Sequence, residues 1–173
     1  NNLMDIDNGV EKNIKLLAEA KNKNISDINV CVLKRPRHDN IVKELTKLNV
    51  KINYIIDGDI AGALSVIGDE PKNDIYYSTG GGPEGVITAA ALSCYGGQIQ
   101  GRLVLNNDEK LRAKKLGIKD FSRKYNINDM VKGDVIFCAT GVTSGDLASG
   151  VKDLGNEFEV NTFALHKSQN TIN

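Results

Sequence analysis

The chain has 173 residues, of which 40% are hydrophobic and 25% are charged, the composition of a folded protein rather than a disordered one. Its 22 Lys and Arg residues balance 22 Asp and Glu residues, so no general basic excess favours a nucleic-acid partner. No apolar run is long enough to span a bilayer, so we expect no membrane partner either.

The three cysteines, Cys31, Cys94 and Cys138, lie far apart, each in its own apolar run. We expect them to be buried as small hydrophobic residues, without a disulfide framework or a CxxC zinc pair. A protein without disulfides fits a reducing compartment, so we expect it in the cytoplasm. The sequence begins at Asn1 rather than at a Met, and we interpret it as a piece of a longer protein.

Apolar residues recur along the chain at two periods, the helical spacing of three or four and the alternation that is typical of strands. In chain order the predicted elements are helix 10–17, strand 28–33, helix 41–48, strand 50–56, helix 60–67, strand 74–78, helix 86–95, strand 99–105, helix 107–116, strand 135–139 and strand 157–167. Because strands alternate with helices, we expect an α/β fold with a largely parallel or mixed sheet flanked by helices. No linker divides the chain, so we expect residues 1–173 to form one domain.

Residues that are typical of helix caps precede three of the predicted helices. Asn8 and Glu11 offer a capping box for the first helix, and Asp39 is a suitable cap for the second. Pro83 suits the first position of the helix that follows a run of glycines.

A basic segment, Lys34-Arg35-Pro36-Arg37-His38, follows the strand predicted at 28–33. Three cations and a histidine within five residues are suited to clamp a phosphate, because a planar guanidinium matches two phosphate oxygens at once. A solvated basic turn before a helix is the alternative. The spacing alone favours neither interpretation.

Two carboxylates flank a glycine in Asp57-Gly58-Asp59, directly after the strand predicted at 50–56. Such a pair is suited to bind a metal ion or to accept hydrogen bonds from sugar hydroxyls. The alternative is a turn followed by a helix cap, because aspartate is common at both positions. Taken by itself, the pattern favours the turn and cap.

A glycine run, Gly80-Gly81-Gly82-Pro83-Glu84-Gly85, leads from the strand predicted at 74–78 into a helix. Glycines let a ligand approach the backbone closely, and a helix N-terminus attracts phosphate through its free N–H groups. The run has neither the Lys of a P-loop nor the spacing of a dinucleotide-binding loop. Glu84 is suited to stabilise the helix dipole or to ligate a metal ion.

Each of these three segments follows a predicted strand. In open α/β sheets ligands bind beyond the carboxyl ends of the strands, so we expect the segments to converge on one crevice. A fourth polar segment, residues 140–146, is as compatible with a plain turn as with a site loop. No Ser-His-Asp or Cys-His arrangement can be assembled from the sequence.

Five motifs, in this order and spacing, resemble those of class II fructose-1,6-bisphosphatases. They are residues 32–38, 56–59, 81–86, 100–103 and 140–146. The resemblance extends over nearly the whole chain. It implies the layered α/β sandwich of the metal-dependent, lithium-sensitive sugar phosphatases, with a mixed sheet flanked by helices. It also implies hydrolysis of the 1-phosphate of fructose 1,6-bisphosphate to fructose 6-phosphate in gluconeogenesis, with Mn²⁺ or Mg²⁺ as the cofactor.

The resemblance further implies roles for individual residues. Arg35-Pro36-Arg37, Asp57-Gly58-Asp59 and Gly81 match motifs that contact the substrate. Glu84 matches a metal ligand. Arg35 stands where lysine is common and Gly82 where alanine is common, and each keeps the charge or the close backbone approach.

The family's other metal carboxylates and its Asp-Pro-(Ile/Leu)-Asp-Gly-Thr motif belong to an N-terminal segment that this sequence does not contain. Glu84 alone cannot hold a two-metal site, which needs several carboxylates. We therefore expect the chain to be a substrate-binding C-terminal domain that is inactive by itself. Its expected partners are the missing N-terminal segment, the substrate fructose 1,6-bisphosphate and further copies of the same protein in a homo-oligomer.

Two alternatives stay open. Sedoheptulose 1,7-bisphosphate or an inositol phosphate as the substrate would keep the enzyme class. A non-catalytic sugar-phosphate-binding module would keep the recognition without the chemistry, and it predicts no acidic metal cluster upstream of Asn1.

Overall fold

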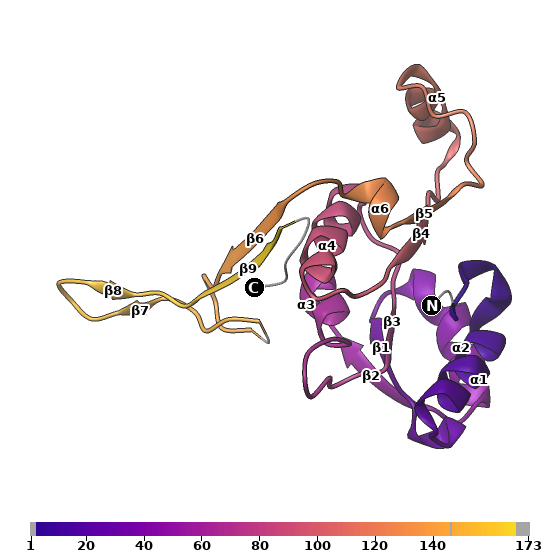
Figure 1. Cartoon of the computed structure of the whole chain (residues 1–173), viewed down its shortest axis with the longest axis horizontal. Helices are drawn as coiled ribbons and strands as arrows, with labels where there is room; N and C mark the ends of the chain where they lie inside the picture. The colour runs from indigo at the N-terminus through magenta and orange to yellow at the C-terminus, as the bar shows by residue number, and fades with distance from the viewer. Residues whose placement is uncertain (1–2, 146, 169–173) are drawn as a thin grey trace.

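A three-stranded parallel sheet forms the centre of the computed structural model, which describes residues 3–145 and 147–168 (Figure 1). Its strand order is β2-β1-β3, with β1 at Asn29–Leu33, β2 at Lys51–Ile55 and β3 at Ile75–Tyr77. Four of the five residues of β1 are buried. A continuous apolar run of this kind is typical of a parallel strand that is covered on both faces.

One face of this sheet is covered by α1 (Gly9–Lys21) and α2 (Asp39–Lys47). Val30 and Val32 of β1 pack there in one cluster with Ile14 of α1, and all three are fully buried. Fully burying an aliphatic side chain contributes roughly 1.5–3 kcal/mol. This cluster is therefore a main part of the core that holds the sheet in place.

The other face of the sheet is covered by α3 (Asp59–Leu64), which packs against β1 and against α4 (Gly82–Cys94). α4 in turn lies on an antiparallel ribbon of β6 (Val135–Thr140) and β9 (Thr162–Lys167). Helices and strands thus alternate through the molecule in the layer order α1/α2, parallel sheet, α3/α4 and ribbon (Figure 1). The predicted α/β fold with helices flanking a sheet is confirmed. Parallel and antiparallel pairs are segregated into separate sheets.

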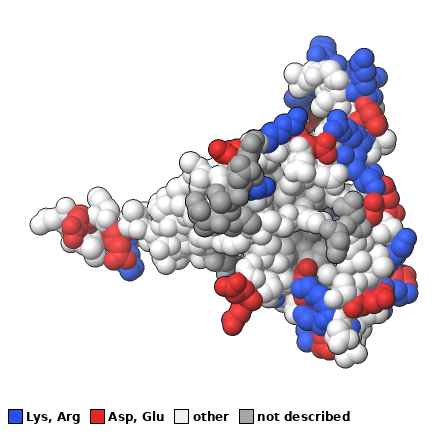
Figure 2. All heavy atoms as spheres, viewed as in Figure 1, with Lys and Arg blue, Asp and Glu red and all other residues white. Residues whose placement is uncertain are grey.

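Two hairpins extend away from these layers (Figure 1). One arm is built from the antiparallel pair β4 and β5 and carries α5, and the other is the antiparallel pair β7 and β8. Their bounds, with that of α6, are β4 Gln100–Arg102, α5 Asn107–Lys115, β5 Lys124–Asn126, α6 Ile127–Met130, β7 Lys152–Asp153 and β8 Phe158–Glu159. Figure 2 shows Lys and Arg gathered over the α5 arm and few charges over the β6–β9 ribbon.

Two of the predicted caps are wrong. Asn8 makes no side-chain cap bond, because the short helical turn Ile6–Asn8 runs directly into α1 and gives Asn8 a helical backbone. Asp39 is the first residue of α2 rather than its cap, because the turn Pro36–His38 continues into that helix. Pro83 follows Gly82 as the second residue of α4, one position later than predicted.

The C-terminal third differs most from the predicted elements. The strand expected at 157–167 is divided, because its first part, β8, pairs with β7 whereas the rest, β9, pairs with β6. The β7–β8 hairpin turns near Gly155. Gly155 has a φ of 91°, a conformation that favours glycine. The short elements β5, α6 and β7 were not predicted, since runs of two to four residues carry no detectable period.

Cys31 and Cys94 are buried as predicted, but Cys138 is exposed. Alternate residues of β6 face opposite sides of the ribbon, and its neighbour Phe137 takes the buried side. The apolar run around Cys138 therefore concealed an outward position. Within residues 3–145 and 147–168, no helix is both long enough and apolar enough to cross a membrane.

Candidate functional site

Three polar segments lie together at the carboxyl edge of the parallel sheet. We name them the basic loop (residues 34–38, after β1), the aspartate turn (residues 57–59, after β2) and the glycine loop (residues 78–84, after β3). Because the three strands are parallel and adjacent, their carboxyl ends meet at one edge. The convergence expected from the sequence is observed, and specific hydrogen bonds cross between the segments.

Arg35 holds the basic loop against the residue that precedes the aspartate turn. Its Nη1 donates to the carbonyl oxygen of Ile56 at 2.7 Å and to that of Lys34 at 2.9 Å. The amide of Lys34 also donates to the carbonyl oxygen of Ile55, which extends the β1–β2 contact by one residue. The base of the basic loop is therefore fixed to the end of β2.

Arg37 reaches in the other direction, to the glycine loop. Its Nε donates to the carbonyl oxygen of Thr79 at 2.5 Å, and the side chain is exposed. This bond does not involve the two Nη groups, which carry the fork that recognises phosphate. The contact orients the guanidinium and leaves its fork for another partner.

His38 is buried between the basic loop and the glycine loop, with 1% of the residue exposed. Its Nδ1 lies 2.6 Å from the carbonyl oxygen of Leu33, and its Nε2 accepts a hydrogen bond from the amide of Thr79 at 2.8 Å. Both ring nitrogens are engaged, so the prediction that this histidine helps to clamp a phosphate is wrong. One feature of the sequence could have predicted that His38 is buried, because this single histidine lies between a buried strand and an amphipathic helix.

Asp59 is tied to β3 and to the start of the glycine loop. Its Oδ1 accepts hydrogen bonds from the hydroxyls of Tyr76 at 2.6 Å and Ser78 at 2.7 Å. Burial and the bond to the Asp59 carboxylate raise the pKa of the Tyr76 phenol above its ordinary range. Sequence reasoning missed Tyr76 and Ser78, and their i, i+2 spacing at a strand end was the available signal.

The backbone conformation of the aspartate turn explains why a glycine lies between its two aspartates. Gly58 has a φ of 85° and occupies the cap position of α3, so Asp59 begins that helix and is not its cap. Asp57 is exposed, and its Oδ1 accepts a hydrogen bond from the amide of Gly58 at 2.9 Å. The turn thus presents the Asp57 carboxylate at the surface and directs Asp59 toward β3.

Glu84 folds back over the glycine loop. Its carboxylate occupies the space that a side chain at Gly81 would need, because a Cβ added there would collide with Glu84 Oε2. Gly82, the next residue, has open space around it. A side chain at Gly81 would therefore displace the exposed Glu84 carboxylate, whereas one at Gly82 would not.

The site offers one side chain that is suited to ligate a hard metal cation, but not the full set of ligands that such an ion needs. Glu84 offers an exposed carboxylate, and carboxylate oxygens are the ligands that Mg²⁺ and Mn²⁺ favour. Within residues 3–145 and 147–168, no three His, Cys, Asp or Glu side chains gather closely enough to hold a metal ion. Further ligands would have to come from outside the described part of the chain.

The fourth polar segment, residues 140–146, belongs to the β6–β9 ribbon. Its Asp146 lies outside the described residues. The amide of Gly141 donates to the carbonyl oxygen of Asn161, and Ser144 Oγ accepts from the amide of Gly150. These contacts tie the described part of the segment to the chain around the second hairpin, and they involve none of the three loops.

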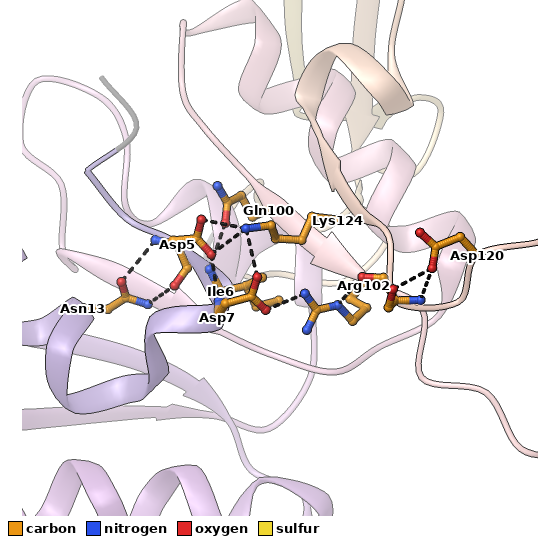
Figure 3. A network of polar contacts seen from close by, with 9 residues as sticks. Asp5, Ile6, Asp7, Asn13, Gln100, Arg102, Asp120 and Lys124 are labelled. Carbon is orange, nitrogen blue, oxygen red and sulfur yellow. Dashed lines mark hydrogen bonds and ion pairs between the residues drawn. The ribbon is translucent and has the colours of Figure 1, made fainter.

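The motif at residues 100–103, which also carries the family resemblance, lies on the β4–β5 arm. Its Gln100 and Arg102 anchor the start of the chain to this arm (Figure 3). Gln100 Oε1 accepts from the amide of Ile6 at 2.9 Å, and Arg102 Nη2 lies 2.5 Å from an oxygen of Asp7. Lys124 contacts Asp7 at 2.9 Å as well, and the bonds from Arg102 and Lys124 lower the pKa of the Asp7 carboxyl. The motif has a structural role here, and each exposed ion pair contributes little.

The candidate site lies at an exposed edge, because Arg37, Asp57 and Glu84 are all exposed. Two hollows of the described surface lie elsewhere. One, of about 310 Å³, is lined by Ser93, Lys132 and Lys167 among others, and the second lies on the α5 arm. The hydrogen bonds between the three loops, not a cavity, define the site.

The chain is similar to proteins of one named family along its whole length. A model of the family described as bacterial fructose-1,6-bisphosphatase, glpX-encoded, matches residues 1–173. The class 2 fructose-1,6-bisphosphatase of Haemophilus influenzae is 34% identical over 98% of this chain and 55% of its own length. Fructose-1,6-bisphosphatase 1 class 2 of Escherichia coli is 32% identical over 98% of this chain and 54% of its own length.

A third relative has a broader name. The D-fructose 1,6-bisphosphatase class 2/sedoheptulose 1,7-bisphosphatase of a Synechococcus species is 33% identical over 96% of this chain and 52% of its own length. The chain thus spans about half the length of the curated relatives it matches. With the family model matched from end to end, the chain belongs to the glpX-encoded bacterial fructose-1,6-bisphosphatase family.

Proposed function

We propose that the full-length protein hydrolyses the 1-phosphate of fructose 1,6-bisphosphate to fructose 6-phosphate and phosphate, and that this chain supplies the substrate-binding side of its site. One observation carries the proposal: in a member of this family, a basic loop is hydrogen-bonded to a glycine loop at the carboxyl edge of a parallel sheet. That edge is where open α/β sheets bind ligands.

The proposed roles follow from the chemistry of each residue. Arg35 and Arg37 bind oxygens of the distal 6-phosphate through their guanidinium groups. Pro36 lies between the two arginines and starts the helical turn that carries Arg37, and its ring fixes the backbone there. Arg37 is already oriented by Thr79, so less side-chain entropy is lost when a phosphate binds.

The sugar contacts come from the other two loops. Asp57 and Asp59 accept hydrogen bonds from sugar hydroxyls, Asp59 through its Oδ2 because Oδ1 already accepts from Tyr76 and Ser78. Gly58 supplies the left-handed turn that directs the two carboxylates apart. Gly81 presents its backbone to the substrate at the start of α4.

A divalent cation, Mn²⁺ or Mg²⁺, would activate water and neutralise charge on the 1-phosphate. Glu84 would supply one ligand at the start of α4, where it folds over Gly81. An N-terminal segment of the same protein would supply the remaining carboxylates. The chain by itself is therefore inactive in this proposal.

We further propose that residues 1–173 form one C-terminal domain of a cytoplasmic homo-oligomer. In support of one domain, α3 contacts both the parallel sheet and α4, which packs on the ribbon. In support of self-association, the projecting β7–β8 hairpin exposes Leu154, Phe158 and Val160.

Phosphate release tests the proposal. The full-length protein and residues 1–173 are each incubated with Mn²⁺ or Mg²⁺ and with fructose 1,6-bisphosphate, sedoheptulose 1,7-bisphosphate or inositol 1-phosphate. We expect the full-length protein to release phosphate from fructose 1,6-bisphosphate, and residues 1–173 to release none. Because one relative is also named a sedoheptulose 1,7-bisphosphatase, activity on that substrate is the second candidate. A full-length protein that binds fructose 1,6-bisphosphate but hydrolyses none of the three compounds would be a sugar-phosphate-binding module instead.

A further inference from the structure

His38 lies at the centre of the candidate site, yet the proposed function gives it no role. It is the last residue of the helical turn that also carries Arg37, and it is 1% exposed. One ring nitrogen contacts the carbonyl of Leu33 at the end of β1, and the other contacts the amide of Thr79 in the glycine loop. Its imidazole therefore joins the end of β1 to the glycine loop, and Thr79 lies 41 residues beyond His38 in the sequence.

The two backbone partners fix which ring nitrogen carries the proton. The amide of Thr79 can only donate, so Nε2 accepts and carries no proton. The carbonyl of Leu33 can only accept, so Nδ1 is the donor. A single neutral tautomer satisfies both contacts, and it makes His38 a link between loops rather than a cation that binds phosphate.

Thr79 is held from both sides by consecutive residues of the basic loop. Arg37 donates to its carbonyl oxygen, and His38 accepts from its amide. Thr79 lies two residues before Gly81, the cap of α4, over which Glu84 folds. A displacement of Thr79 would therefore shift the proposed phosphate-binding group Arg37 relative to the start of α4.

We propose that His38 is a positioning residue that sets the spacing between the basic loop and the glycine loop, and thereby places Arg37 for the distal phosphate of the substrate. This inference rests on the proposed function. His38 acts through Arg37 and Thr79 and does not itself touch the substrate.

Two substitutions separate the two hydrogen bonds of His38. In His38→Asn the amide nitrogen takes the place of Nδ1 and keeps the bond to Leu33, but the side chain is too short to reach Thr79. In His38→Gln the amide oxygen takes the place of Nε2 and keeps the bond to Thr79, while the bond to Leu33 is lost. Both variants lose one buried hydrogen bond, so both are destabilised by a similar amount.

The KM for fructose 1,6-bisphosphate is measured with both variants of the full-length protein, with Mn²⁺ at saturation and below the melting temperature of each. We expect KM to rise about fivefold or more in His38→Asn and less than about threefold in His38→Gln, with smaller changes in kcat. A ratio of the KM of His38→Asn to that of His38→Gln of about 1.5 or more supports the proposal. A smaller ratio overturns it, because a merely structural role affects both variants alike. If His38→Asn does not fold, a KM for His38→Gln within about threefold of the parent supports the proposal, and a larger rise overturns it.

A spectroscopic measurement tests the link without relying on catalysis. In ¹⁵N-labelled full-length protein, the His38 imidazole is identified by its absence from the His38→Gln spectrum. We expect the nitrogen chemical shifts of the neutral tautomer protonated at Nδ1, and the shifts of the opposite tautomer or of a protonated ring would overturn the proposal. If the parent protein hydrolyses no sugar bisphosphate while this tautomer is present, the proposed function has failed and the loop link has not.

Discussion

The two edges of the parallel sheet are built in different ways. At the carboxyl edge, the arginines and the histidine of the basic loop bond to backbone groups of the neighbouring loops, and Asp57 and Glu84 stay exposed. At the amino edge, the Asp74 side chain is 4% exposed and is held by Lys21, by Lys23 and by the amide of Asn29. One edge thus leaves charged groups exposed, which our proposal assigns to the substrate, whereas the other uses charged groups to close the fold.

The largest expected effect is on catalysis and arises at the carboxyl edge. Glu84→Gln in the full-length protein keeps the shape of the side chain but removes the negative charge of the proposed ligand. We expect kcat/KM to fall by about a hundredfold or more, with a raised Mn²⁺ requirement, in phosphate-release assays over a range of Mn²⁺ concentrations. Unchanged Mn²⁺ activation would remove Glu84 from the ligand set.

The next effect concerns stability at the amino edge. Burial by itself would raise the pKa of Asp74, but the hydrogen bonds from Asn29, Lys21 and Lys23 outweigh it and lower the pKa from 3.8 to about 2. We expect Asp74→Asn to lower the free energy of unfolding by about 1–2 kcal/mol, since both lysines are partly exposed and screened by solvent. Chemical denaturation at neutral pH measures this change.

The contribution of Asp74 to the free energy of unfolding should decrease at acid pH. The folded pKa of Asp74 is below the unfolded value, so its contribution is complete above pH 3.8 and is lost as the pH falls toward about 2. Asp74→Asn should lack this part of the acid destabilisation. Asp27→Asn is the matched control, because Asp27 pairs with Lys51 through two largely exposed side chains and should change stability little. Equal losses in the two variants would contradict the assignment.

A smaller effect separates two adjacent glycines. Gly81→Ala places a methyl group against the Glu84 carboxylate, whereas Gly82→Ala places it in open space. Gly81 is the cap of α4 and Gly82 its first residue, and Gly81 has a φ of −72°, which alanine adopts without strain. We expect kcat/KM to fall about tenfold for Gly81→Ala and less than about twofold for Gly82→Ala, since only the first displaces a proposed ligand. Similar activities of the two variants would mean that the Glu84 position is unimportant.

The smallest expected effect is a loss of affinity. Arg37→Ala removes a proposed phosphate contact, and we expect KM for fructose 1,6-bisphosphate to rise about tenfold or less, with a smaller change in kcat. Lys43→Ala is the control, because it removes one positive charge from an exposed position on α2. A fall in kcat at constant KM would contradict a role of Arg37 in substrate binding.

The sequence was most informative where strands end in motifs with strong local chemistry. β1, β2 and β3 were predicted because runs with β-branched or aromatic residues end where polar segments begin, at Lys34, Asp57 and Thr79. From parallel strands it follows that these segments meet at one edge. Their roles toward a substrate stay predictions, since the geometry shows where the residues lie and not what they bind.

Long-range contacts could not be predicted from the sequence. The burial of His38 depends on Thr79, which is 41 residues away, and the anchoring of Asp59 depends on Tyr76. Periodicity reports which face of an element is apolar, but not which polar group a distant segment will offer. The exposure of Cys138 was missed for a related reason, because a continuous apolar run does not reveal that one face of β6 is uncovered.

The contrast between the two edges is tested most directly by measuring KM for fructose 1,6-bisphosphate and the free energy of unfolding together, for Arg37→Ala and Asp74→Asn of the full-length protein. We expect Arg37→Ala to raise KM by up to about tenfold with little change in stability, and Asp74→Asn to lower stability by about 1–2 kcal/mol with KM unchanged. A raised KM in Asp74→Asn, or an unchanged KM in Arg37→Ala, would contradict a carboxyl edge built for the substrate.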